Sequence, residues 1–451
     1  MKYCQIAPLI MLTILTSCTH RERALTPQMI TEFASQTAAQ TFNPELRSNS
    51  LAKVLADIEV VDSADTTCTY RVATQGITDQ SNSGRCWLFS TLNILRSEMI
   101  ERYNLGNFQF SQTYGQFWDV LEKSNLFLEN VVDNRRKPLT SRMNQWLFNK
   151  PIGDGGHFAN AAHVITKYGV VPREVMPEAY SSTDNAEMMR LVLTLLRRYG
   201  LQLREAPKSQ IADIKKEALA EIYSLLTATL GTPPEQFVWT MTDRNGNTLS
   251  TESYTPQSFR ERFVGHNLEN DYIIFMDDPT RPYGRTYEVD CSRNCYELEN
   301  WHFVNLPTDK LSKFAVNSLR EGRMFYVSAD TSHDAMAERG VYDTHTFDYQ
   351  KTLGINASMS KREMIESCES RSAHAIAVAG VKLDAEGKPV KWLIENSFGT
   401  QRGWDGFVVM SQEWFERYLF RMVVEKRFVD DEILRLYSSK PVVIPAWNPT
   451  Y

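Results

Sequence analysis

The sequence lacks a basic block, and no stretch interleaves Arg or Lys with aromatic residues. Its 451 residues carry 49 Lys and Arg against 55 Asp and Glu, so the formal net charge is −6. We therefore expect no nucleic-acid partner. No internal repeat or low-complexity tract is visible, and the composition, 42% hydrophobic and 23% charged, is that of a soluble globular protein.

Metal-ligand patterns are also missing. No HExxH motif and no paired-His spacing occurs among the eight histidines, which argues against a metalloenzyme. Cys291 and Cys295 lie close together, but a zinc site there would need two more ligands that the sequence does not place. We interpret these two residues as structural or free, with a bridge between them as an alternative, and expect no metal and no other cofactor.

No apolar run is long enough to span a bilayer. Lys2 supplies a positive start, and the apolar run from Ile6 to Leu15 is short, as in a secretory signal. The run ends in Leu15-Thr16-Ser17-Cys18, which resembles the lipobox of bacterial lipoproteins. The resemblance implies lipidation of Cys18 and a place in the bacterial cell envelope, outside the cytoplasm, at the outer membrane or cell surface. An ordinary secretory signal with a chance cysteine is the alternative.

Cysteine is scarce, with seven residues in the chain. Cys4 would be removed with the signal peptide, and Cys18 would be lipidated. If Cys86 is kept free, four cysteines remain, an even number in a compartment that permits disulfides. The sequence does not give their pairing.

The order of predicted elements places helices first and strands last, which indicates an α+β protein with two lobes. Residues 1–18 form the signal, 19–70 a tether and N-terminal segment, and 71–451 the main domain. Within that domain, 185–231 is almost wholly helical in pattern and is predicted to be an insertion. Residues 438–451 form a C-terminal arm.

Cys86 stands where a polar loop gives way to a helix. Ser81-Asn82-Ser83-Gly84 is turn and cap material, and after it the apolar residues Leu88, Leu92, Leu95 and Met99 repeat as on an amphipathic helix. In the first helical turn, free N–H groups and the helix dipole favour a thiolate, and such thiols have a pKa lowered from about 8.5 to roughly 3.5–7.5. Gln80 is close enough for its amide to donate to an oxyanion beside the sulfur. The alternative is that Cys86 is a small buried hydrophobe.

Two late segments supply partners for this cysteine. Ala373–Val378 and Trp392–Ser397 alternate like strands, and the turn at Asp384–Pro389 would join them as a hairpin. Antiparallel pairing can then bring His374 beside Asn396. An amide that accepts from one imidazole nitrogen leaves the other nitrogen to face the thiol, which is the Cys-His-Asn form of a catalytic triad. Taken alone, His374 could be a core histidine and Asn396 a turn residue.

These motifs are similar to those of the bleomycin hydrolase/aminopeptidase C group of papain-like cysteine peptidases. The resemblance covers about residues 70–451 and rests on these segments: Ser83-Gly84-Arg85-Cys86-Trp87-Leu88-Phe89, Asp154-Gly155-Gly156, Tyr168-Gly169-Val170-Val171-Pro172, Pro177-Glu178-Ala179-Tyr180-Ser181-Ser182, Asp278-Pro279, Pro282-Tyr283-Gly284, Met359-Ser360-Lys361, Ser372-Ala373-His374-Ala375, Glu395-Asn396-Ser397-Phe398-Gly399 and Ile444-Pro445-Ala446-Trp447-Asn448-Pro449. Compact relatives place His and Asn about 130–150 residues after the Cys. The longer separation here agrees with an inserted segment.

The resemblance implies a papain-like two-lobed fold and assigns a role to each candidate residue. Cys86 would be the nucleophile, His374 the general base and acid, and Asn396 the residue that orients the histidine. Gln80, with the backbone N–H of Cys86, would form the oxyanion hole. One departure is Phe398, which replaces the usual tryptophan and keeps an apolar shield without an indole N–H.

The implied activity is release of amino acids from the N-termini of peptides, and some members act on amide-containing drugs. Gly155 and Gly156 would pair with a peptide substrate. The carboxylate of Tyr451 would stand where the substrate's amino group docks, on an arm shorter than usual. This leaves an endopeptidase or a di- or tripeptidyl peptidase as alternatives.

The family's implied assembly is a homohexamer with an internal channel, although its members are mostly intracellular and this chain carries a lipoprotein signal. Two alternative functions from other functional classes are an inactive, lipid-anchored binding protein and a cysteine acyltransferase.

Overall fold

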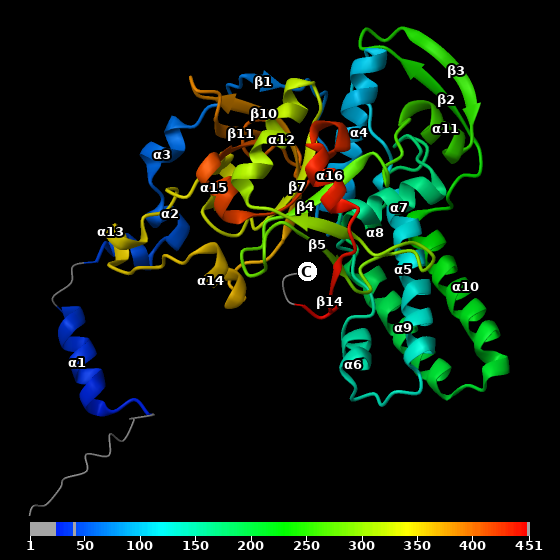
Figure 1. Cartoon of the computed structure of the whole chain (residues 1–451), viewed down its shortest axis with the longest axis horizontal. Helices are drawn as coiled ribbons and strands as arrows, with labels where there is room; N and C mark the ends of the chain where they lie inside the picture. The colour runs from blue at the N-terminus through cyan, green and yellow to red at the C-terminus, as the bar shows by residue number, and fades with distance from the viewer. Residues whose placement is uncertain (1–23, 39–41, 449–451) are drawn as a thin grey trace, which may run out of the picture. The chain divides into compact units, whose positions relative to one another are not determined.

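The computed structural model describes residues 24–38 and 42–448 (Figure 1). The predicted signal with Cys18, and the terminal Tyr451, lie outside the described residues. The chain divides into two compact units. The smaller unit holds the residues up to Leu55 together with Tyr349–Ile355, and the larger unit holds Ala56–Asp348 and the chain from Asn356 onward.

The smaller unit is helical. Its first helix, α1 (Pro27–Ala38), runs to the edge of the described segment. A 3-10 turn begins where the side chain of Asn43 accepts from the N–H of Glu45. The elements of this unit are α1 (Pro27–Ala38), the 3-10 turn Pro44–Arg47, α2 (Leu51–Leu55) and α13 (Tyr349–Leu353). No helix of the described residues in either unit is long and apolar enough to cross a membrane.

A mixed sheet organises the larger unit, in the order β14-β5-β6-β4-β13-β7-β10-β11-β12-β9-β8, with β1 paired to β10. The strands are β1 (Tyr70–Arg71), β4 (Tyr272–Met276), β5 (Arg285–Val289), β6 (His302–Asn305), β7 (Phe325–Ala329), β8 (Ala335–Met336), β9 (Val341–Tyr342), β10 (His374–Leu383), β11 (Pro389–Glu395), β12 (Phe407–Ser411), β13 (Leu419–Glu425) and β14 (Val442–Ile444). The predicted hairpin is confirmed, because β10 and β11 pair antiparallel with Ala377 opposite Glu395. On its other side β10 pairs with β7, so its apolar side chains are buried along most of its length.

Helices pack beside this sheet, and a separate hairpin is formed by β2 (Phe237–Thr242) and β3 (Thr248–Tyr254). The helices are α3 (Ile58–Ser63), α4 (Cys86–Tyr103), α5 (Gln112–Asn134), α6 (Arg142–Asn149), α7 (Phe158–Tyr168), α8 (Tyr180–Thr183), α9 (Ala186–Glu205), α10 (Ile211–Leu230), α11 (Pro256–Phe263), α12 (Thr308–Arg320), α14 (Lys361–Glu366), α15 (Gln412–Tyr418) and α16 (Asp431–Tyr437). The long helices α5, α9 and α10 lie side by side (Figure 1). The predicted α+β class is therefore confirmed.

Helix α9 runs further than its sequence suggests. Gly200 favours a helix end, yet α9 continues through it to Glu205. A Cβ at Gly200 would lie 3.1 Å from the ring of Phe148 and 3.2 Å from the ring of Phe127. The glycine therefore allows two aromatic rings to approach the helix and does not end it.

Helix α4, which begins with Cys86, differs from the amphipathic helix predicted for it. Every residue from Trp87 to Ile100 is buried, including polar ones, because α4 packs against β10 on one side and against α5 and α7 on others. A buried helix must satisfy its polar side chains internally. Arg96 does so with three backbone carbonyls, those of Gln75, Gly76 and Phe108.

Arg96 also forms an ion pair with Glu395, the last residue of β11. Its Nη2 lies 2.6 Å from Oε1 of Glu395, and both side chains are 1% exposed or less. Removing one partner of a buried pair leaves an uncompensated charge, which typically destabilises a protein by about 3–5 kcal/mol. The pair therefore ties the helix of Cys86 firmly to the strand that leads into Asn396.

We predict that Arg96→Met lowers the free energy of unfolding by about 3–5 kcal/mol, as measured by urea denaturation of the full chain. The matched control is Arg339→Met, because the Arg339–Asp62 pair is about half exposed. Exposed pairs contribute about 0–1 kcal/mol, so the control should shift the urea midpoint little. Equal shifts for the two variants would contradict the importance assigned to the buried pair.

Candidate active site

Cys86 is the first residue of α4, as predicted. Arg85 occupies the N-cap position without a capping side chain, and its carbonyl accepts from the N–H groups of Leu88 and Phe89. The N–H of Cys86 itself belongs to the helix start, where backbone donors have no intrahelical partner. It is therefore in place to bind an anion that forms beside the sulfur.

The pKa of the Cys86 thiol is raised above its ordinary value, because burial disfavours the thiolate. Hydrogen bonds from the backbone N–H groups of Ala375 and Trp87 act in the opposite direction without overcoming the burial. The expectation of a lowered pKa is therefore wrong for the free site. Since Ala375 follows His374, the contact also shows that the sulfur faces the start of β10.

His374 and Asn396 meet as predicted. Nε2 of His374 lies 3.0 Å from Oδ1 of Asn396, and both residues are buried. The same Oδ1 accepts from the N–H of Ser397, which fixes it as an acceptor. Nε2 of His374 therefore carries the hydrogen, and Nδ1 is left with a free lone pair. Burial lowers the pKa of His374, and the bond to Asn396 partly opposes that shift.

Phe398 covers the histidine. The two rings are stacked, with centroids 5.0 Å apart and an angle of 13° between their planes. The guanidinium of Arg402 lies 5.3 Å from the centre of the Phe398 ring. The shield predicted for this position is therefore present although the residue is not a tryptophan.

Gln80 is held from two sides. Its Nε2 donates to the carbonyl of Ser83 at 2.7 Å, and its Oε1 accepts from the hydroxyl of Ser397 at 2.6 Å. Its backbone N–H donates to the carbonyl of Ser397 as well. Because a carboxamide nitrogen carries two hydrogens, one remains for an oxyanion. Ser397 follows Asn396, so one short segment positions the side-chain amides of both Asn396 and Gln80.

Gly155 and Gly156 lie against the cysteine loop. The carboxylate of Asp154 accepts from the N–H of Gly84 at 2.6 Å, and its carbonyl accepts from the indole of Trp87 at 2.9 Å. A Cβ at Gly156 would lie 2.8 Å from that indole, so this position has no room for a side chain. A Cβ at Gly155 would meet no atom within 4 Å. The Gly-Gly segment therefore borders open space, as a backbone that binds an extended peptide must.

Sequence reasoning missed the residues that support the loop. Arg85 is 1% exposed, donates to the hydroxyl of Ser83 and forms an ion pair with Glu178 at 2.8 Å. The hydroxyl of Ser83 in turn donates to the carbonyl of Gln80. A charged residue between the loop glycine and the cysteine was the available signal, but its partner lies 93 positions away.

Four further cysteines lie among the residues that the structure describes. Cys68, Cys291, Cys295 and Cys368 are free, and no disulfide joins Cys291 to Cys295. Burial and the neighbouring carboxylate of Asp290 raise the pKa of Cys291 to about 12. Within residues 24–38 and 42–448, no group of three or more His, Cys, Asp or Glu side chains is placed to hold a metal ion.

Known proteins resemble this chain over most of its length. The model of the peptidase C1-like family matches residues 22–450. The aminopeptidase C of Streptococcus thermophilus is 34% identical over 380 residues, 83% of this chain and 85% of that protein. The bleomycin hydrolase of Rattus norvegicus is 34% identical over 388 residues, again 83% of this chain and 85% of the relative. The crystal structure of PepW from Lactobacillus rhamnosis HN001 superposes with a TM-score of 0.91 at 30% identity, and covers 95% of this chain and 99% of its own.

These matches bear out the fold class and the family that the motifs indicated. The match to PepW covers 95% of this chain, and the fold is papain-like. The chain belongs to the peptidase C1-like family and is a papain-like cysteine peptidase.

Proposed function

We propose that this protein is a cysteine aminopeptidase that removes residues from the N-termini of peptides. The observation that carries the proposal is the bond between His374 and Asn396, set at the strand start that faces the sulfur of Cys86. Relatives named aminopeptidase C, about one third identical over most of the chain, support the exopeptidase class. The occupied catalytic positions argue against an inactive binding protein.

The chemistry follows from the free lone pair on Nδ1 of His374. This nitrogen takes the thiol proton as the sulfur of Cys86 attacks the peptide carbonyl, and the oxyanion is bound by Gln80 and the N–H of Cys86. His374 then gives the proton to the leaving amine, and a thioester remains on the sulfur. Water, deprotonated by His374, hydrolyses the thioester and frees the acid and the thiol.

The burial of Cys86 and His374 affects the first step, the proton transfer between them. The pKa of the thiol is raised and that of the imidazole is lowered, so each group alone prefers its neutral form. A charge formed on one group is stabilised only if the opposite charge forms beside it. We therefore propose that the proton moves from Cys86 to His374 as substrate arrives and excludes water. Asn396 steadies the resulting imidazolium through its carbonyl oxygen.

A second proposal concerns the location of the protein in the cell. Leu15-Thr16-Ser17-Cys18 follows a short apolar run, which supports a lipid anchor at Cys18 and a place in the bacterial envelope outside the cytoplasm. The homohexamer that the resemblance implies would then have its subunits tethered to a membrane. Sedimentation of the detergent-extracted full chain measures that assembly.

The oxyanion role of Gln80 is tested by Gln80→Ala. We expect kcat to fall by about 10²–10³ with little change in KM, the loss typical of one oxyanion donor. Ser397→Ala, which frees Oε1 of Gln80, should lower kcat by only about five- to tenfold, in line with one neutral hydrogen bond. The exposed Gln145→Ala is the control, and an unchanged kcat in Gln80→Ala would refute the assignment.

The exopeptidase class is tested with a defined ten-residue peptide and its N-acetylated twin. An aminopeptidase needs the free ammonium group, so mass spectrometry should show stepwise loss of single residues from the free peptide alone. Cys86→Ala should abolish this stepwise loss. Release of di- or tripeptides, or cleavage of the acetylated peptide, would show instead one of the two alternative peptidase activities.

Lipidation is tested by growing cells with labelled palmitate. The wild-type protein should take up label and partition into detergent, and Cys18→Ala should do neither. Cys4→Ala is the matched control, because it changes a cysteine inside the predicted signal and should leave labelling intact. An unlabelled wild-type protein in the aqueous phase would contradict the anchor.

A further inference from the structure

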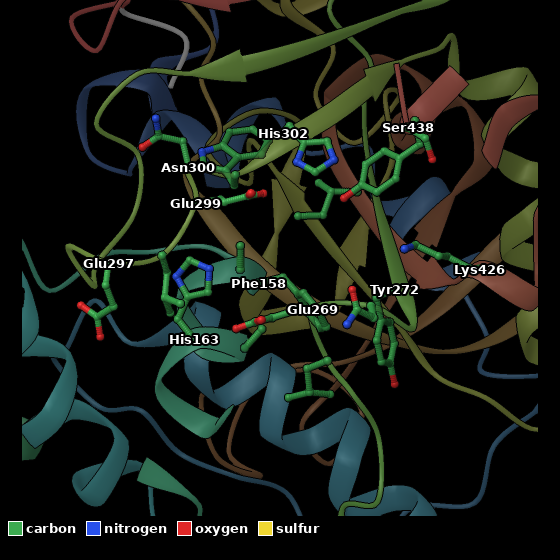
Figure 2. Close-up of a pocket in the computed structure, with 18 residues that line it drawn as sticks. Phe158, His163, Glu269, Tyr272, Glu297, Glu299, Asn300, His302, Lys426 and Ser438 are labelled. Atoms are coloured by element: carbon green, nitrogen blue, oxygen red, sulfur yellow. The ribbon is translucent and has the colours of Figure 1, made fainter. Parts of the chain in front are cut away.

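The larger unit also has a pocket of about 540 Å³, which is drawn in Figure 2. It is bordered by α7, the start of β4, the segment 297–302 and the end of α16. Gln80, Cys86, His374 and Asn396 are not among its lining residues. Its size falls in the range of about 300–1,000 Å³ that is usual for small-molecule sites.

One side of the pocket presents a hydrogen-bond acceptor. His163 is 6% exposed, and its Nδ1 lies 2.9 Å from Oδ1 of Asn294. The Asn294 amide nitrogen donates to Asp119 and to the carbonyl of Asn160, which fixes Oδ1 as the acceptor. Nδ1 of His163 therefore carries the hydrogen, and Nε2 has a bare lone pair with no partner among the described residues. Since burial lowers the pKa of His163, this lone pair persists at neutral pH.

Carboxylates surround this acceptor. Glu269, Glu297 and Glu299 line the pocket, and their side chains are exposed at its rim. Glu297 pairs with Lys167, whereas Glu269 and Glu299 form no ion pair among the described residues. A ligand group placed here must donate hydrogen bonds and carry positive charge, as an ammonium group does.

The opposite side presents a cation. The half-buried Lys426 lines the pocket and lies across it from His163, as Figure 2 shows. Its Nζ lies 5.4 Å from the centre of the Tyr437 ring, and no carboxylate that the structure describes is within ion-pair distance. Burial lowers the pKa of Lys426, so the amine gains from an anionic partner. This side therefore fits a carboxylate.

We propose that this pocket binds a small zwitterion, a free amino acid or dipeptide, with its ammonium group near His163 and Glu299 and its carboxylate on Lys426. A simple carboxylic acid has no positive charge to compensate the glutamates at the rim. A diamine would place a second positive charge beside Lys426, which repels it. The inference does not rest on the proposed peptidase activity, although such molecules are what peptide hydrolysis yields.

Isothermal titration calorimetry with Ala-Ala tests the proposal on the full chain carrying Cys86→Ala, so that the probe is not consumed. We expect Ala-Ala to bind, and N-acetyl-Ala-Ala and Ala-Ala amide each to bind at least tenfold more weakly. The doubly blocked dipeptide should show no binding in the same range. Absence of binding by Ala-Ala at 10 mM (roughly −2.7 kcal/mol) overturns the proposal.

Two pocket variants in the same background locate the site. Lys426→Met should weaken Ala-Ala at least tenfold yet leave the weak binding of Ala-Ala amide unchanged, because the amide has no carboxylate to lose. Glu299→Gln should weaken Ala-Ala and leave N-acetyl-Ala-Ala unchanged. Lys440→Met and Glu432→Gln remove matched exposed charges outside the pocket and should bind as the parent does.

Folding of each variant is checked by its circular dichroism spectrum and melting temperature. If Ala-Ala binds Lys426→Met and Glu299→Gln as tightly as it binds the parent, it occupies the catalytic cleft, and the proposal is overturned. Equal affinities for blocked and unblocked dipeptides overturn it as well. Neither result bears on the peptidase activity, which is measured separately with the wild-type enzyme.

Discussion

The buried ion pair between Arg96 and Glu395 is the constraint on which the arrangement of the site depends. It joins α4, whose first residue is Cys86, to the end of β11, whose next residue is Asn396. A charge pair that water does not reach tolerates little displacement, because each partner is costly when alone. Cys86 and Asn396, which are 310 positions apart in the sequence, are thereby held in fixed relative positions.

Hydrogen bonds connect Gln80 and the loop before Cys86 to this contact between α4 and β11. Ser397 donates to Gln80, so the segment after β11 positions the Gln80 amide as well as the partner of His374. Arg85 and Glu178 hold the loop on its other side. These contacts bury the site. Burial raises the pKa of Cys86 and lowers that of His374. Each shift favours the neutral form of its group, which is the basis of the proposed transfer of the thiol proton to His374 when substrate binds.

Local patterns in the sequence predicted much of this. The change from Gly84 to an apolar repeat located the start of α4, and alternation with a turn located the hairpin of His374 and Asn396. The features that were predicted wrongly depend on contacts between residues that are far apart in the sequence. Helix α9 continues past Gly200, where two aromatic rings approach it, and the desolvation of Cys86 reverses the pKa shift expected from a helix start. Ion partners such as Glu178 leave no periodic signal, so only the folded chain shows them.

The most direct test of the account is rapid-quench mass spectrometry of the full chain mixed with an ester of a single amino acid whose amino group is free. The ester speeds acylation, so the thioester should accumulate before water removes it. We expect one acyl group per chain, on the proteolytic fragment that contains Cys86, and none in Cys86→Ala. An acyl group on another residue, or turnover of the ester by Cys86→Ala, would contradict the central claim that Cys86 is the nucleophile.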